Sequence, residues 1–187
     1  MAEEKKDPWL NYLAVTTVVL AVSATLSTFY GQRYSTRTVI SEIKASNQWN
    51  WFQAKRIRAY LVEAQKDNIQ NSLSTIDRAT QAPLAENLEK RMAGYSAKLK
   101  EWDQEQKEIS ENAKKLEQTR DQAMKHGSAF GYAVIFLQLA ILLSSIAALM
   151  KKKGVWIIGL IVGAFGLLLF ADGFWLFLEP MVARIGG

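Results

Sequence analysis

The sequence predicts an all-α membrane protein with three transmembrane helices. A long extramembrane antiparallel helical hairpin, a coiled coil, is expected between the first and second of them. Three stretches, residues 9–30, 129–150 and 155–178, contain one charged side chain between them, that of Asp172. Each stretch exceeds the ~20 residues that a helix needs to cross the hydrocarbon core of a bilayer. Residues 31–127 instead carry 17 basic and 13 acidic side chains. A soluble domain would interleave its charged and core residues, so this distribution excludes that class.

These stretches divide the chain into seven consecutive segments. They are a cytoplasmic N-terminal segment (1–8), transmembrane helix 1 (9–30), the extramembrane hairpin (31–127, arms about 36–80 and 84–125), transmembrane helix 2 (128–150), a short basic cytoplasmic loop (151–154), transmembrane helix 3 (155–178) and a C-terminal tail (179–187).

Two arms are expected because Pro83 interrupts a segment rich in helix-favouring residues. Proline is tolerated in the first turn of a helix, so residues 80–83 are interpreted as a break followed by a new helix. The second arm shows a nearly continuous 4-3 spacing, which is typical of a coiled-coil seam. Its seam is Leu88, Met92, Tyr95, Leu99, Trp102, Gln106, Ile109, Ala113, Leu116, Arg120 and Ala123.

The first arm shows a weaker pattern of the same kind. Its predicted seam is Ile40, Ile43, Ala54, Ile57, Leu61 and Ala64, followed after a phase shift by Ile69, Leu73 and Ile76. Polar residues such as Asn47 and Asn68 weaken a seam, and they can also fix its register or oligomer number. Because two such seams bury little apolar area, we expect the protein to form a homo-oligomer.

The first third of the chain carries a family resemblance. The residues concerned are Gly31, Tyr34-Ser35-Thr36, Ala45-Ser46-Asn47-Gln48-Trp49 and Gln53-Ala54-Lys55. With the preceding apolar stretch, they resemble the bacterial DUF4337 family of membrane proteins. The order of one span, a helical middle and two closing spans extends the likeness to the rest of the chain. The resemblance implies a bacterial membrane location and implies no activity.

The orientation follows from the short basic loop, Lys151-Lys152-Lys153-Gly154. Short loops rich in lysine stay in the cytoplasm, whereas long domains contribute little to orientation. The N-terminal segment with Lys5 and Lys6 is then cytoplasmic. We therefore expect a multi-pass protein of the inner membrane whose hairpin is periplasmic.

The most unusual feature outside the apolar stretches is an aromatic-basic segment, which is the candidate partner-binding site. It consists of Trp49, Trp51, Phe52, Lys55, Arg56 and Arg58. One interpretation is a patch that binds an anionic partner, such as a lipid headgroup, a cell-wall polymer or an acidic protein surface. The other is packing of the tryptophans against the return helix or a neighbouring subunit.

Two features of the third apolar stretch are candidate sites. Asp172 is an intramembrane acid, a residue type that marks proton or ion pathways or else is neutralised by its surroundings. Gly159, Gly163 and Gly166 have the spacing that lets membrane helices approach closely, so they predict a span-packing surface. The single histidine, His126, adjoins Gly127 and Gly131, where a hinge between the second arm and transmembrane helix 2 is expected.

The residue types argue against catalysis and metal binding. The chain has no cysteine and one histidine, and no phosphate-binding loop, metal-ligand run or nucleophile–base pair is recognisable. No catalytic residue, cofactor or metal is predicted. The mixed signs of charge argue against a nucleic-acid partner.

The expected function is therefore that of a non-enzymatic structural, scaffold or interaction protein. It would self-assemble in the lipid bilayer through its hairpin and its spans. Two alternatives remain open. One is an accessory subunit of a larger membrane enzyme or transporter, bound through the surface at residues 159–166; the other is a homo-oligomeric channel.

Overall fold

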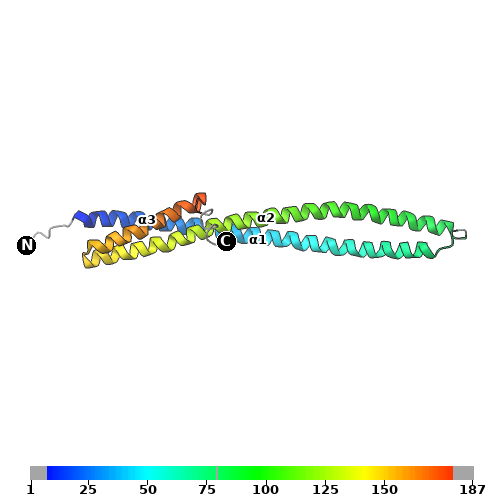
Figure 1. The fold of residues 1–187 in the computed structure, drawn as a ribbon, viewed down its shortest axis with the longest axis horizontal. Helices are drawn as coiled ribbons and strands as arrows, with labels where there is room; N and C mark the ends of the chain where they lie inside the picture. The colour runs from blue at the N-terminus through cyan, green and yellow to red at the C-terminus, as the bar shows by residue number, and fades with distance from the viewer. Residues whose placement is uncertain (1–7, 79, 179–187) are drawn as a thin grey trace, which may run out of the picture. The chain divides into compact units, whose positions relative to one another are not determined.

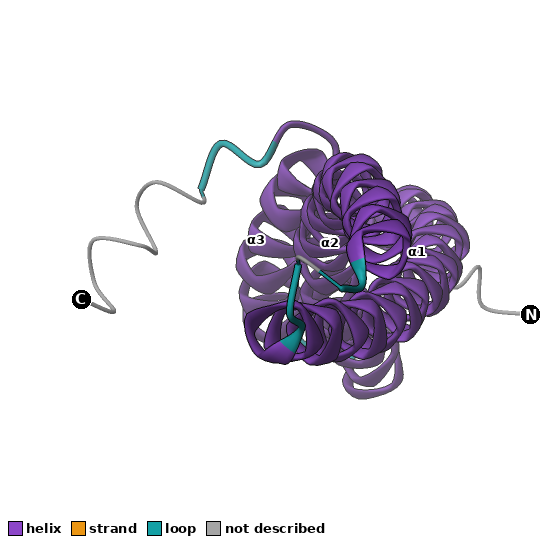
Figure 2. Cartoon of the chain, turned by 90° about the vertical axis from the view of Figure 1, so that its right-hand side faces the viewer, coloured by secondary structure: helices purple, strands orange, loops and turns teal. Residues whose placement is uncertain are grey.

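The structure is a computed structural model that describes residues 8–78 and 80–178. All regular secondary structure within these ranges is helical, and they contain no strand (Figure 2). The helices are α1 (Pro8–Thr75), α2 (Ala82–Met150) and α3 (Lys153–Trp175), shown in Figure 1. Each contains a stretch that is long and apolar enough to cross a membrane. The all-helical prediction is confirmed. The predicted terminal segments, 1–8 and 179–187, lie outside the described residues apart from Pro8.

The helices α1 and α2 each continue from an apolar stretch into a charged arm without interruption. The hinge expected beside His126 is wrong, because α2 runs unbroken through Gly127 and Gly131. Gly127 has a different purpose. A Cβ atom there would lie 3.6 Å from Cβ of Tyr34 and 3.9 Å from the carbonyl oxygen of Gly31. This glycine therefore allows α1 and α2 to approach closely, rather than allowing α2 to bend.

The break between the arms lies where proline predicts it, but α1 ends at Thr75 rather than near residue 80. The hydroxyls of Ser72, Ser74 and Thr75 donate to backbone carbonyls of the preceding turn, a competition that commonly accompanies helix ends. A turn follows in which the backbone N–H of Gln81 donates to the carbonyl of Asp77. Helix α2 then begins at Ala82, so that Pro83 lies in its first turn, where an N–H is not needed.

The short connection between α2 and α3 is a tight left-handed turn. Lys151 has a φ of 48°, and the N–H groups of Lys151 and Lys152 donate to the carbonyls of Ala148 and Ala147. This pair of bonds satisfies the last carbonyls of α2 in the manner of a Schellman motif. Helix α3 consequently begins at Lys153, earlier than predicted, and ends at Trp175 rather than residue 178.

The chain forms two compact units. The three-helix unit contains the described residues of Met1–Ile40 and Thr119–Gly187, and the two-helix unit those of Ser41–Gln118. In the three-helix unit, one apolar cluster consists of Leu20 and Ala24 of α1 with Ala133, Leu137 and Ala140 of α2. A second cluster contains Trp9, Leu13 and Ala147. The ring of Trp9 lies 6.0 Å from that of Trp156 on α3, so all three helices contribute to this core.

Most of the buried residues of α3 are glycines, among them Gly159, Gly163 and Gly166. A Cβ atom on Gly159 would lie 3.4 Å from the carbonyl oxygen of Ala140, and one on Gly166 would lie 3.0 Å from the backbone nitrogen of Leu137. Gly163 faces Leu20 of α1, whose Cδ2 atom would be 2.9 Å from an added Cβ. The predicted span-packing surface is thus used within the chain, against α2 and α1.

The outward faces of the same unit are apolar. Val18 is 63% exposed, Ile161 67% and Leu149 86%. Helices that are apolar on all sides are typical of membrane spans, because lipid rather than water surrounds their outer faces. Together with the length of the apolar stretches, this surface indicates a membrane protein.

In the two-helix unit, α1 and α2 pair in antiparallel order. Three polar contacts join residues that ascend along α1 and descend along α2. The pairs are Trp49 with Glu117, Lys55 with Glu105, and Arg78 with Glu89.

The seam predicted for α2 faces inward: each of its members from Leu88 to Leu116 is buried or half-buried. The seam predicted for α1 is wrong over residues 40–64. Ile43, Ile57 and Leu61 are 55%, 60% and 61% exposed. From Ser41 onward, the buried and half-buried positions of α1 other than Trp49 form a different 4-3 series, without a phase shift, which continues to Ile76 just beyond the helix. They are Ser41, Ala45, Gln48, Phe52, Lys55, Ala59, Val62, Lys66, Ile69, Leu73 and Ile76.

The close approach of α3 leads to a testable expectation about stability. Gly166→Ala should lower the free energy of unfolding by about 1–3 kcal/mol, because the new methyl group meets the backbone of Leu137. Gly131→Ala is the matched control, since nothing lies within 4 Å of its Cβ position. This change should stabilise α2 by about 0.5–1 kcal/mol. Denaturant unfolding in detergent micelles measures both, and equal effects would contradict the packing.

Candidate functional site

The aromatic-basic segment lies wholly on α1 of the two-helix unit, and the structure divides it into two groups. Trp49, Phe52 and Lys55 are half-buried, on the side of α1 that faces α2. Trp51, Arg56 and Arg58 are exposed. The six residues therefore do not form one continuous surface.

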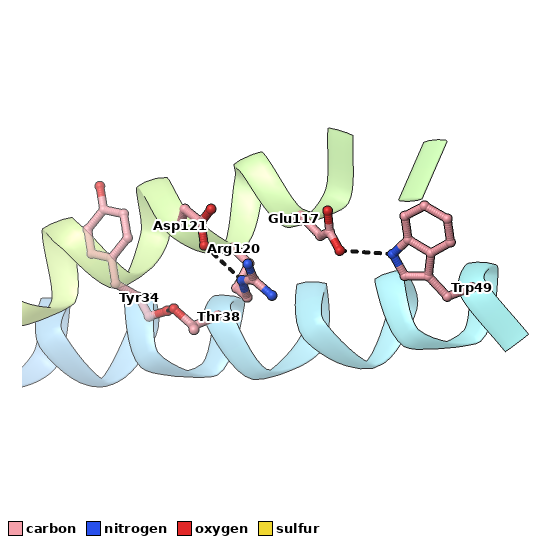
Figure 3. A network of polar contacts seen from close by, with 6 residues as sticks. All are labelled: Tyr34, Thr38, Trp49, Glu117, Arg120 and Asp121. Carbon is pink, nitrogen blue, oxygen red and sulfur yellow. Dashed lines mark hydrogen bonds and ion pairs between the residues drawn. The ribbon is translucent and has the colours of Figure 1, made fainter. Parts of the chain in front are cut away.

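Trp49 is held by contacts within the unit. Its indole Nε1–H donates a hydrogen bond of 2.8 Å to Oε1 of Glu117 on α2 (Figure 3). Its ring meets that of Phe52 edge-on, with centroids 5.6 Å apart. A half-buried indole needs a partner for its N–H group, and the carboxylate supplies one. These contacts favour the packing interpretation for Trp49 and Phe52.

Lys55 is balanced by neighbouring acids. Lys55 forms an ion pair with Glu105 of α2, and its ammonium lies 5.5 Å from the centre of the Trp51 ring. A hollow of about 220 Å³ beside this pair is lined by Trp51 and Lys55, and also by Glu105 and Glu108. A surface with two carboxylates next to one ammonium is not a strong anion-binding site.

Arg56 is arranged in a similar way. Its Nε–H donates to the hydroxyl oxygen of Tyr60 at 2.7 Å, and the guanidinium lies over the Tyr60 ring. The adjoining hollow, of about 320 Å³, is lined by Arg56 together with Glu63 and Asp103. The mixed charge weakens the hypothesis of an anionic partner for this part of the segment.

Asp172 is 7% exposed and is used in ending α3. Its Oδ1 atom accepts a hydrogen bond of 2.7 Å from the backbone N–H of Leu178, and its carbonyl accepts one of 2.7 Å from Leu176. Leu176 has a φ of 51°, the left-handed conformation that terminates many helices. The carboxylate thus satisfies a backbone donor just beyond the helix, which is a structural role.

His126 forms a hydrogen bond with the last turn of α3. Its Nδ1 atom lies 2.8 Å from the carbonyl oxygen of Gly173. Because a carbonyl only accepts, Nδ1 carries the proton and donates. The Gly173 carbonyl is in the last turn of α3, where helical carbonyls lack an intrahelical partner. The imidazole also stacks on Tyr34 of α1, at 4.7 Å between ring centres.

Gly173 is a packing residue that the sequence analysis did not single out. A Cβ atom there would lie 2.6 Å from the Phe130 ring, so no other residue fits without displacing it. Phe130 is fully buried, and it meets Phe170 and Phe174 edge-on. A signal was present, because Gly159, Gly163, Gly166 and Gly173 follow one 4-3 series in which Phe170 occupies the remaining position.

Glu105 and Glu117 were also missed. No sequence signal identifies which of the many glutamates of α2 meets a lysine or an indole of α1, since that depends on the register of the two helices. Among residues 8–78 and 80–178, no three His, Cys, Asp or Glu side chains come together as a group that could hold a metal ion.

A comparison with known protein families shows which family the chain belongs to. The family described as "Domain of unknown function (DUF4337)" matches residues 9–176. The chain belongs to the DUF4337 family. The match begins in the first turn of α1 and ends at the left-handed residue that terminates α3, so the DUF4337 domain includes all three helices and both units. No curated protein and no solved structure matches the chain.

The two tryptophans of this DUF4337 segment are expected to respond differently to substitution. Trp49→Phe removes the N–H donor to Glu117 and should lower the free energy of unfolding by about 1 kcal/mol. Trp51→Phe, the matched control, changes a ring that is 53% exposed and should have little effect. Chemical denaturation in detergent measures both. An equal loss for the two variants would show that the Trp49 contact contributes nothing to folding.

Asp172 should tolerate an amide but not an alkyl group. Asp172→Ala removes the acceptor of the Leu178 N–H and should cost about 1 kcal/mol of unfolding free energy. Asp172→Asn keeps a carbonyl oxygen in the same position and should retain most of the stability. If the two variants were equally destabilised, the negative charge rather than the acceptor would be what the site requires.

Proposed function

We propose that the protein is a non-enzymatic structural or interaction protein of the bacterial inner membrane that assembles with copies of itself. One observation supports this most directly. The charged two-helix unit leaves large apolar side chains in contact with water, including Ile43, Ile57 and Leu61. Exposed apolar side chains in such an array favour association, because burial removes them from water.

In this proposal, the apolar stretches of the three helices span the bilayer. Their exposed valines, leucines and isoleucines then face lipid, and the charged turn at Lys151–Lys153 is cytoplasmic. The neighbouring Trp9 and Trp156 are suited to the same interface, where the amphipathic indole ring is favoured. The chain would accordingly carry its two-helix unit on the periplasmic side.

The two-helix unit would be an antiparallel coiled-coil hairpin. Each arm extends ~50 Å at the usual rise of an α-helix. Its interior is only partly apolar, because Ser41, Gln48, Lys55 and Lys66 occupy inward positions on α1. Such an interior stabilises a hairpin weakly, so association with further helices would contribute to its stability.

The two alternative functions have less support. A surface at Gly159–Gly166 for binding a larger enzyme or transporter is covered by α2 and α1 of the same chain. A channel would use polar groups along a span, whereas the carboxylate of Asp172 is engaged with the backbone of Leu178.

The test is the mass and composition of the particle extracted from native membranes with a mild detergent. We expect a mass that is an integer multiple, two or more, of 21.1 kDa, with this chain as its sole protein. Native mass spectrometry measures both properties. A single-chain mass would contradict self-assembly, and a foreign subunit in fixed ratio would instead support the accessory-subunit function.

A further inference from the structure

Helix α1 of the two-helix unit carries two separate heptad series. The inner series, which begins at Ser41 and ends at Ile76, packs against α2. The second, which we call the outer stripe, consists of Ile43, Asn47, Asn50, Ala54, Ile57 and Leu61. Every member of the outer stripe is exposed. A 4-3 series of this kind is the pattern that one helix presents to another helix, rather than to a flat surface or a small ligand.

We propose that the outer stripe is the interface with α1 of a second copy of this chain, parallel and in register, in a coiled coil. This inference rests on the proposed self-assembly and specifies the surface that forms it. Ile43, Asn50 and Ile57 take the d positions, and Asn47, Ala54 and Leu61 take the a positions.

The two asparagines indicate what kind of helix covers the stripe. A carboxamide buried in a helical interface needs both a donor and an acceptor opposite it. In a parallel pair in register, Asn47 faces Asn47 of the other copy, and the same holds for Asn50. A second copy therefore supplies the matching group at both levels, and an asparagine at such a position also excludes other registers.

The charges beside the stripe fit the parallel arrangement. The residues that flank the stripe occupy the g and e positions of the heptad. In a parallel pair, each g residue of one copy meets the e residue five positions later in the other copy. The flanking pairs are then Ser46 with Trp51, Gln53 with Arg58 and Tyr60 with Gln65, none of which joins like charges. An antiparallel pair centred on Trp51 would instead bring Lys44 against Arg58. Copies inserted the same way in one membrane are also parallel.

The experiment uses the absence of cysteine from the chain. Single-cysteine variants Ala54→Cys and Leu61→Cys place a thiol at a positions of the outer stripe. Glu63→Cys is the matched control, because Glu63 is exposed on the same helix but lies outside the stripe and its flanks. Mild oxidation in native membranes should yield at least tenfold more disulfide-linked dimer at positions 54 and 61 than at position 63.

A second measurement tests whether a substitution in the stripe disrupts the interface. Ile57→Glu should shift the extracted particle to a smaller mass with unchanged helicity, whereas Gln70→Glu, at an exposed position away from the stripe, should not. If positions 54 and 61 crosslink no better than 63 while the wild-type particle contains several copies, this inference is overturned and self-assembly stands. A single-chain wild-type mass overturns both. Crosslinking of the stripe to a different protein also overturns the inference.

Discussion

The three-helix unit is built around the fully buried face of α2, most of whose residues are small. The members of this face are Phe130, Ala133, Leu137, Ala140, Ser144 and Ala147, and they lie along one side of the helix. In a membrane, lipid is as apolar as a leucine side chain, so the hydrophobic effect drives helix association only weakly. Close van der Waals packing has to replace it. Alanines on α2 and glycines on α3 bring the backbones together and make that packing possible.

The same close packing explains the polar groups within this unit. Asp172 and His126 both satisfy backbone groups at the end of α3, where the helix stops at the left-handed Leu176. Both are residue types that suggest chemistry when they are found in or near a span. Here each has a partner that accounts for its presence. The Oγ atoms of Ser27 and Ser144 lack a hydrogen-bond partner among the described residues, and both side chains are fully buried.

The two-helix unit follows a different rule, because water surrounds it in the proposed arrangement. The inner series of α1 contains Lys55 and Gln48, whereas several large apolar side chains of the unit point outward. A hairpin optimised for its own stability would have the reverse distribution. The arrangement is consistent with a helix that must satisfy two neighbours, one within the chain and one outside it. Polar contacts such as that of Trp49 with Glu117 then fix the register of α1 against α2 without requiring an apolar core.

The amino-acid sequence was sufficient to predict the all-helical class, the three apolar stretches, the break before Pro83 and the inward face of α2. Each of these depends on local composition or on one clear period. The face of α1 that meets α2 could not be predicted in this way, because α1 carries two 4-3 series and the more apolar one is exposed. Lys55 of the inner series is paired with Glu105 of α2, and this contact is not encoded in α1. The roles of Asp172, His126 and Gly173 were likewise set by the place where α3 ends, since that position brings distant residues to its last carbonyls.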